Sequence, residues 1–116
     1  MGKKVEWKFR SKQISDATAN IDIKSDAVRH GWKRTIQRVA VEDETTACTE
    51  IRLGYIDKME LIAWLAEQET PQAGVLYWVK DLVVLTEGQQ LIVRFTGSSS
   101  PDALNVYATG FEEEVR

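Results

Sequence analysis

The residues that could support catalysis are few in this chain. Cys48 is the only cysteine and His30 the only histidine among 116 residues. A nucleophilic cysteine needs a base or an electropositive pocket to hold it as the thiolate, and His30 stands in a polar stretch before Gly31. We therefore interpret Cys48 as a small apolar side chain of the core and predict no catalytic residue and no enzyme activity. A lone cysteine cannot staple the fold, which is typical of a reducing compartment.

Acidic residues are the next candidates, either for a metal site or for a catalytic carboxylate pair. Glu42, Asp43 and Glu44 are consecutive, but they lack the glycine and the spaced oxygen ligands of an EF-hand loop. A solvated loop is the preferred interpretation, with a Ca²⁺ site as the alternative. No spacing among the 18 acidic residues selects a pair for glycoside hydrolysis. Residues 97–100 read Gly-Ser-Ser-Ser without the Gly-Lys-Ser/Thr of a phosphate loop, so we predict no metal and no cofactor.

Aromatic residues offer a different chemistry, the stacking of a flat ligand. The chain contains four Trp, three Tyr and three Phe residues. Trp64 and Trp78 could form a sugar-stacking platform if they are exposed. The preferred interpretation is burial in a small core or in a subunit contact, because Trp and Tyr bury large areas. The residues predicted to contact a partner are Trp7, Phe9, Trp64 and Trp78.

Basic residues gather in two segments, residues 3–12 and residues 29–38. Interleaved aromatic residues are typical of some nucleic-acid surfaces, but a net charge of −3 opposes attraction of phosphate. We predict a solvated or subunit-contacting edge and no specific nucleic-acid partner. No apolar run approaches the roughly 20 residues that cross a bilayer, and the start of the sequence lacks the apolar part of a secretory signal. A membrane partner is therefore not expected.

Alternation of apolar and polar residues is the strongest pattern in the chain. Ile51, Leu53 and Tyr55 alternate with other residues, and residues 90–96 and 103–109 alternate in the same way. A period of two places successive side chains on opposite faces of a strand. Strands that recur about every 8–12 residues between turn residues indicate a sandwich or barrel. The sequence therefore predicts an all-β fold, an antiparallel β-sandwich of jelly-roll type with about eight strands.

Two local features refine this prediction. In residues 33–41, Val39 and Val41 share one parity and Ile36 has the other, which predicts a β-bulge or burial on both sides. A polar loop separates this segment from residues 48–55, and we predict that the two strands pair as a hairpin.

Residues 58–68 fit two patterns. They contain strong helix formers whose apolar members fit a helical stripe, and they also fit strand alternation. We prefer the strand because the neighbouring segments are all strands. A short helix at 58–68 is the alternative.

A wider pattern carries a resemblance to a known class of proteins. The run from Val39 to Gly54, VAVEDETTACTEIRLG, resembles small structural proteins of tailed-phage particles, and residues 71–78, 85–97 and 102–110 extend the match. The resemblance spans about residues 34–110. It implies a β-sandwich that contacts copies of itself and other virion proteins, is assembled in the host cytoplasm and resides in the virion.

The resemblance also implies a division of the chain within a single domain. Residues 1–30 lie outside it and are interpreted as an arm or edge-strand region that docks on neighbouring subunits, whereas residues 31–116 form the sandwich core. The predicted function is a non-enzymatic assembly protein of the neck, tail or capsid surface of a tailed phage or phage-like particle. The alternative is a carbohydrate-binding β-sandwich module that uses exposed Trp or Tyr.

Overall fold

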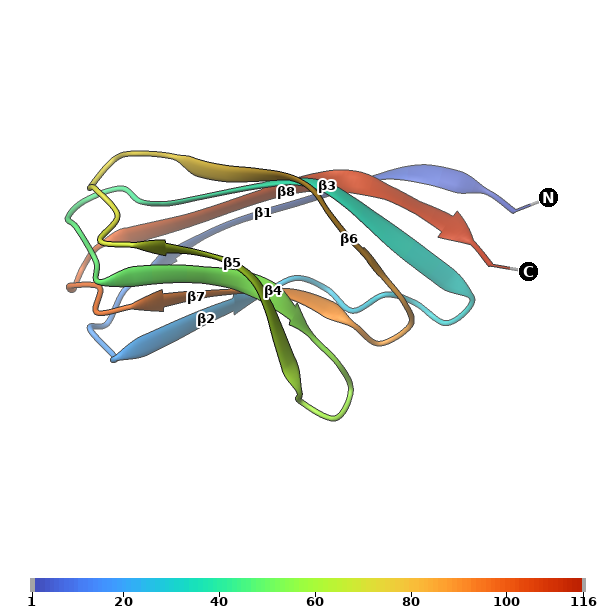
Figure 1. Ribbon diagram of the computed structural model, residues 1–116, viewed down its shortest axis with the longest axis horizontal. Coiled ribbons are helices and arrows are strands. Elements are labelled where there is room, and N and C mark those ends of the chain that lie inside the picture. The colour runs from blue at the N-terminus through green and yellow to red at the C-terminus, as the bar shows by residue number, and fades with distance from the viewer. Residues whose placement is uncertain (1, 116) are drawn as a thin grey trace.

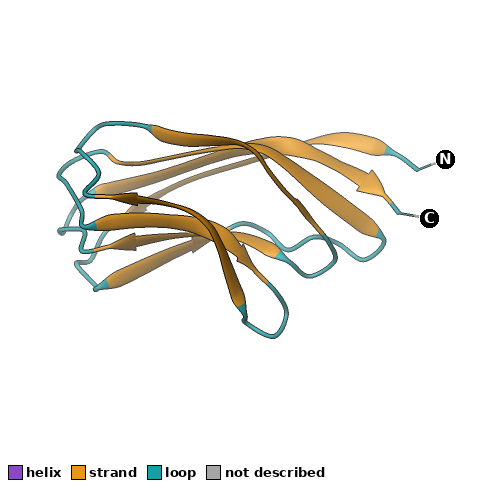
Figure 2. Ribbon diagram, in the orientation of Figure 1, coloured by secondary structure: helices purple, strands orange, loops and turns teal. Residues whose placement is uncertain are grey.

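The computed structural model describes residues 2–115, without the side chains of residues 81 and 82. Within this range the chain forms eight strands and no helix, as Figure 2 shows. No helix in the described range could therefore span a membrane. The strands are β1 (Lys4–Ile14), β2 (Asn20–Lys24), β3 (Trp32–Asp43), β4 (Glu50–Ile56), β5 (Ile62–Glu69), β6 (Tyr77–Leu85), β7 (Gln90–Thr96) and β8 (Ala103–Glu114).

The strands form two four-stranded sheets that face each other (Figure 1). One sheet has the order β1-β8-β3-β6 and the other the order β2-β7-β4-β5. All six strand pairs are antiparallel, and this interleaved order is that of a jelly roll. The predicted fold class, an antiparallel β-sandwich of jelly-roll type, is confirmed.

The predicted hairpin between the third and fourth strands is wrong. β3 pairs with β6 and β8, whereas β4 pairs with β5 and β7 in the other sheet. The connection crosses between the sheets after Asp43. Its backbone is fixed by other segments, because Glu44 N–H donates to the Ala103 carbonyl and Gly74 N–H donates to the Asp43 carbonyl, each at 2.9 Å. Alternation along a strand does not reveal in which sheet the strand lies.

Residues 62–69 form strand β5, so the strand interpretation of residues 58–68 is confirmed over most of its length and the helix is absent. A tight turn precedes the strand. The Asp57 carboxylate accepts hydrogen bonds from the N–H groups of Met59 and Leu61 at 2.9 and 3.0 Å. An acidic side chain that binds its own following backbone favours a turn over a helix. The turn leaves Met59 and Leu61 exposed.

Two β-bulges interrupt the sheets, and a glycine sits beside each one. The bulge in β3 lies between Ile36 and Arg38, where the parity change predicted it. A Cβ atom at Gly110 of β8 would clash there with the Thr35 carbonyl oxygen. The second bulge accompanies Gly54 of β4, which packs in the same way against the backbone of β5. Small residues therefore allow the strands to approach where their register shifts.

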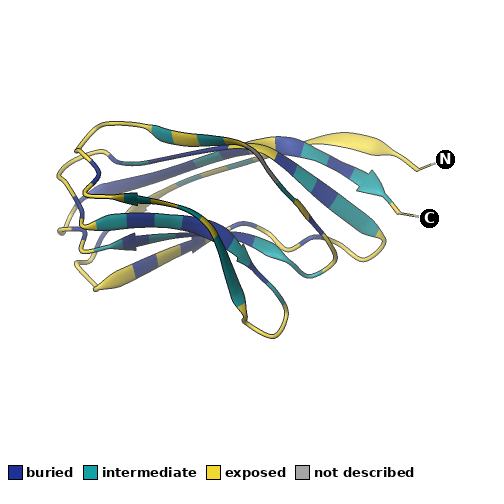
Figure 3. Ribbon diagram, in the orientation of Figure 1, coloured by how far each residue is buried: buried dark blue, intermediate teal, exposed yellow. Residues whose placement is uncertain are grey.

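The core lies between the sheets, and both ends of the chain contribute to it (Figure 3). Residues 1–30, interpreted from the sequence as an arm or edge-strand region, do not form a projecting arm in the described range. β1 and β2 are the outer strands of their sheets, and the segment supplies Trp7, Ile21, Ile23 and Val28 to the core. These buried side chains tie the segment to the sandwich, because exposing them would cost roughly 1.5–3 kcal/mol for each large aliphatic residue.

A buried arginine joins β1, β3, β8 and the β2–β3 loop. Arg34 is fully buried, and its guanidinium lies 4.2 Å from the centre of the Trp7 ring. The Arg34 Nη2 atom donates to Glu112 Oε2 at 3.0 Å and to Asp26 Oδ2 at 2.8 Å. The sequence places Arg34 in a basic cluster on a solvated or subunit-contacting edge. The structure corrects this prediction, since two carboxylates and an aromatic ring enclose the charge.

Candidate functional site

The two candidate nucleophile and base residues do not meet. Cys48 is buried and its predicted burial is confirmed. Burial raises the pKa of the Cys48 thiol to about 11, so the thiol is protonated near neutral pH and is a poor nucleophile. Its hydrogen bond goes to the Glu50 carbonyl at 3.9 Å. His30 is exposed and pairs instead with Glu87.

The three acidic residues at the end of β3 and the start of the following loop face two sides of the chain. Glu44 is exposed and Glu42 half-buried, and both carboxylates accept from Asn105 Nδ2, at 2.5 and 3.0 Å respectively. Asp43 is buried instead and turns toward the β7–β8 loop. The solvated loop predicted here therefore applies to Glu44 only. The three carboxylates do not converge on one point, which does not fit the Ca²⁺ alternative.

Asp43 and Asp102 form a carboxyl pair at this end of the sandwich. Burial, together with the neighbouring carboxyl group of Asp102, raises the pKa of Asp43 from 3.8 to about 6. Burial also acts to raise the pKa of Asp102, but hydrogen bonds from Thr46 and Asp43 lower it overall. The Thr46 hydroxyl donates to Asp102 Oδ2 at 2.5 Å. The pair thus shares one proton below about pH 6, and Asp43 is its carrier.

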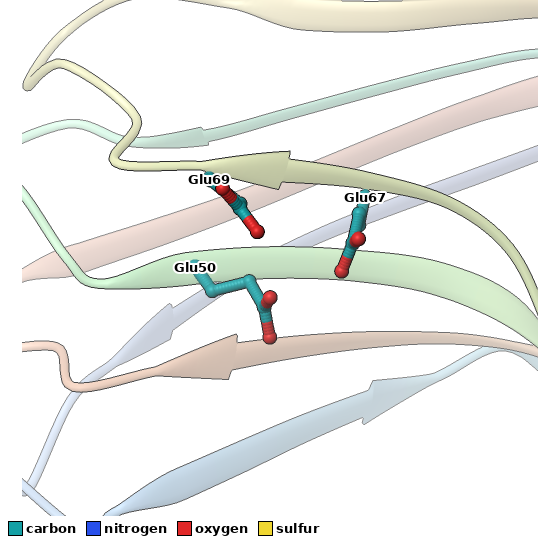
Figure 4. Close-up of side chains that lie close together, drawn as sticks. All are labelled: Glu50, Glu67 and Glu69. Atoms are coloured by element: carbon teal, nitrogen blue, oxygen red, sulfur yellow. The ribbon is translucent and has the colours of Figure 1, made fainter.

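A cluster of three carboxylates lies on the outer face of the second sheet (Figure 4). Glu50 of β4 and Glu67 and Glu69 of β5 bring carboxylate oxygens within 4.8 Å of one another. Arg52 Nε lies 2.9 Å from Glu50 Oε1 and 3.3 Å from Glu67 Oε2. This arginine supplies the positive charge that the cluster needs, so the arrangement is an ion-pair network with a surplus of negative charge. We call these three glutamates the acidic cluster.

The four aromatic residues predicted to contact a partner occupy different environments. Trp7 is 6% exposed and belongs to the core, where it stacks on Phe9 with ring centres 6.4 Å apart. Phe9 is half-buried against the same core. Trp64 is half-buried, and the Arg94 guanidinium lies 5.1 Å from its ring. Trp78 is 55% exposed and is the most exposed of the four.

Exposed apolar side chains recur along the side of the molecule where β5 and β6 lie. Of the ten large hydrophobic residues that are exposed in the described range, half lie on β5, on β6 or on the loop between them. The ribbon coloured by burial shows exposed segments along these strands (Figure 3). We call this set the apolar edge, and it consists of Leu65, Val75, Leu76, Trp78 and Val84.

A crevice opens between the two sheets at the apolar edge. β5 and β6 are the last strands of their sheets on this side, and the crevice between them has a volume of about 120 Å³. Its lining includes Val41, Leu53 and Val79 from the interior, together with Tyr77 and Trp78. The core is therefore incompletely closed where the apolar residues are exposed.

A row of basic side chains crosses the outer face of the first sheet beside Trp78. Arg38 of β3 and Lys80 of β6 are opposite each other in the register and both are exposed. Their charged groups lie 5.6 and 5.1 Å from the centre of the Trp78 ring. Among the described side chains, no carboxylate lies within ion-pair distance of either one. We call Arg38 and Lys80 the basic pair.

The amino-acid sequence suggests only part of this surface. The sequence identifies Trp78 as an aromatic residue in a predicted strand. It does not show that the Trp78 side chain is exposed, because the residues around it do not alternate between apolar and polar. The apolar edge draws on two strands and the loop between them, and the basic pair draws on two strands, β3 and β6, that are far apart in the sequence. Register in the folded sheet brings Arg38 and Lys80 together, and no local pattern contains that information.

Comparison with known proteins supports the fold. No protein-family model matches the sequence, and no curated protein sequence matches it. A protein of the disulfide-linked pili of Bacillus endospore appendages aligns with a TM-score of 0.51 and 8% identity over 100% of this chain and 92% of that chain. The protein PirA aligns with a TM-score of 0.52 and 12% identity over 87% and 92%.

A protein of the Gx strain of infectious bursal disease virus also aligns, with a TM-score of 0.49 and 9% identity over 97% of this chain and 31% of that chain. Identities of this size show a shared fold alone. The chain is a β-sandwich, as the resemblance to tailed-phage proteins implies, and the phage role itself is a separate hypothesis.

Proposed function

We propose that the protein is a non-enzymatic structural subunit of a tailed-phage or phage-like particle, in its neck, tail or capsid surface. The observation that carries this proposal is the apolar edge, where five large apolar side chains are exposed on neighbouring segments. Large apolar side chains exposed on neighbouring segments are typical of a surface that a partner covers. Trp78 is its central aromatic residue, and Trp is enriched in the energetically dominant positions of protein interfaces.

The opposite side of the first sheet is built to avoid pairing. β1 is the edge strand there, and its outward side chains alternate through Lys4, Glu6, Lys8, Arg10 and Lys12. Charged side chains along an edge strand block unwanted strand addition. This contrast between the two sides supports association through the apolar edge, with copies of the chain or with other virion proteins.

The remaining parts of the proposal come from the sequence resemblance. It implies a protein that resides in the virion after assembly in the host cytoplasm, with structural proteins as partners and without a specific nucleic-acid or membrane partner. A pilus protein of Bacillus shares the fold, which illustrates that a sandwich of this size can serve as the subunit of an assembly.

Two measurements test the proposal together. Size-exclusion chromatography with light scattering should detect oligomers of the purified protein, and mass spectrometry of purified particles should detect the protein in them. A Trp78→Ala variant should associate at least tenfold more weakly than wild type and keep its fold, because the side chain is 55% exposed. A protein that is strictly monomeric and absent from particles would contradict the proposal.

A carbohydrate-binding module is the alternative function, and the exposure of Trp78 is the observation that favours it. An exposed indole next to a crevice can stack on the apolar face of a sugar ring when the exposed side chains of Arg38 and Lys80 move off its face. Glycan-array binding by wild type that is lost in Trp78→Ala, with no change in circular dichroism, would favour this alternative. Trp64→Ala is the matched variant, since the Trp64 ring is half-buried and covered in part by Arg94.

A further inference from the structure

We infer that two copies of the chain associate edge to edge about a two-fold axis, with β6 of each copy beside β5 of the other. This inference rests on the proposed function, because it names the contact through which an assembly subunit would first associate. The proposed contact involves the apolar edge, the basic pair and the acidic cluster. Within one copy, these three surfaces have no common role.

The topology permits this contact. β5 and β6 end their sheets on the same side of the sandwich and line one crevice, so each presents backbone groups without a neighbouring strand. The two strands run in opposite directions in Figure 1. A two-fold axis parallel to the strands keeps their directions and exchanges the two sheets. The axis therefore places β6 of each copy antiparallel to β5 of the other copy. Dimers with C2 symmetry are the commonest closed assemblies.

The charges are complementary in this arrangement. Trp78 and Lys80 alternate with inward residues on β6, so they face outward, and Glu67 and Glu69 face outward on β5. The exchange of sheets makes the outer face of one copy's first sheet continuous with the outer face of the partner's second sheet. The basic pair then lies beside the partner's acidic cluster, twice in the dimer. Opposite charges on neighbouring strands stabilise a sheet, and complementary potentials select the partner.

The apolar residues would supply the centre of the contact. The crevice is lined by core residues that a second edge would shield from water, and Trp78 and Ala66 line it from the two edge strands. β6 has nine residues, hence a length of about 30 Å at 3.3 Å per residue. Figure 1 looks down the shortest axis onto this edge, so the width of the edge face is the 26 Å extent, and the face measures roughly 800 Å² per copy, the size of one side of a standard interface.

Charge reversal with complementation tests the contact. We would measure sedimentation velocity of wild type, of Arg38→Glu/Lys80→Glu and of Glu67→Lys/Glu69→Lys over a concentration series. Wild type should form dimers that weaken at high salt. Each double variant alone should dimerise at least tenfold more weakly, because like charges then meet at both contacts. An equimolar mixture of the two variants should restore dimers, since each edge again meets its opposite.

The control is Lys4→Glu/Lys8→Glu on β1, which makes the same change of net charge at the far edge of the same sheet and should leave dimerisation unchanged. All exchanged side chains are exposed, and circular dichroism checks their fold. A mixture that does not dimerise, an equal loss in the control, or an open series of larger oligomers would overturn the two-fold contact. So would a monomeric wild type in which the basic pair binds an oligonucleotide or an acidic glycan.

The outcomes also separate this inference from the proposed function. A protein that is found in purified particles, but is monomeric in solution at every concentration, overturns the edge-to-edge dimer and leaves the structural role standing. A protein that is monomeric and absent from particles overturns both.

Discussion

Asp43 has an unusual setting among the acidic residues, since it is 1% exposed and lies beside a second carboxyl group, that of Asp102. Its Oδ1 atom accepts from the N–H groups of Thr45 and Thr46 at 3.2 and 3.4 Å. Its other oxygen, Oδ2, is buried, and no hydrogen-bond donor lies beside it among the described residues. A proton on this carboxyl group, shared with Asp102, would satisfy that oxygen. A proton on Asp43 therefore helps to hold the β3–β4 loop against the β7–β8 loop.

This setting predicts a dependence of stability on pH. The pKa of Asp43 is raised from 3.8 to about 6 in the folded state, so its stabilising contribution is complete below pH 4 and is lost as pH rises to 6. Asn in place of Asp43 can donate to Asp102 at every pH. The free energy of unfolding of Asp43→Asn relative to wild type should therefore increase by about 1–2 kcal/mol between pH 4 and pH 6 and then level off.

Urea denaturation of both proteins at a series of pH values measures this difference. The comparison cancels the groups that the two proteins share, including exposed carboxylates such as Asp16. A difference that is constant over the series, or that decreases as pH rises, would show that Asp43 does not hold a proton in the folded protein.

Arg34 gives a second prediction at the scale of one residue. Replacing it with Met leaves Glu112, whose side chain is 9% exposed, without its nearest cation, and breaking a buried ion pair costs about 3–5 kcal/mol. Arg94→Met is the matched control, because Arg94 pairs with Asp22 near the surface and such pairs contribute about 0–1 kcal/mol. Guanidinium denaturation measures both variants. Equal losses would mean that the buried network contributes no more than a surface pair.

The sequence predicts single residues unevenly. It identifies Cys48 as a core residue, because a lone cysteine without a nearby base has no other role. It does not predict the burial of Arg34, because the carboxylate that compensates its charge, that of Glu112, is 78 positions away. Asp43 is missed for the same reason, since Asp102 comes from a different loop. Pairing of charges that are so far apart in the sequence depends on the topology of the fold, and the alternation of apolar and polar residues does not reveal it.

At the scale of elements, the two glycines beside the bulges fix how closely neighbouring strands approach. Gly110→Ala would drive a methyl group into the Thr35 carbonyl oxygen, and a backbone atom cannot move aside as a flexible side chain can. We expect a loss of about 1–3 kcal/mol in the free energy of unfolding, typical of overpacking. Thr109→Ala, at the preceding exposed position of β8, should change stability by less than about 0.5 kcal/mol. Thermal denaturation compares the two, and an unperturbed Gly110→Ala variant would contradict the close approach.

Elements are predicted well wherever the local pattern decides them. The bulge in β3 follows from the parity of Ile36 against Val39, and strand β5 follows from its neighbours in spite of its helix-forming residues. The hairpin of β3 and β4 is wrong because pairing partners are chosen by the whole sandwich. Loop bonds from Glu44 to Ala103 and from Gly74 to Asp43 direct the crossing between sheets, and these bonds join segments that are distant in the sequence.

At the scale of the whole molecule, the sandwich has two unlike sides. One side ends in the charged strand β1 and the short strand β2, and the other ends in β5 and β6 with exposed apolar side chains and an open crevice. The fold class follows from the sequence, but this asymmetry depends on strand order. A jelly roll brings strands β5 and β6 to one side although they belong to different sheets, and only the assembled fold shows their shared edge.

Hydrogen–deuterium exchange of wild type at low and high protein concentration tests the central claim, association through the edge of β5 and β6, most directly. If the edges associate, raising the concentration slows exchange in residues 62–69 and 77–85, whose outer backbone groups gain partners. Exchange in residues 4–14 should stay unchanged. Protection that appears in residues 4–14 instead, or exchange that is independent of concentration throughout, would contradict the account.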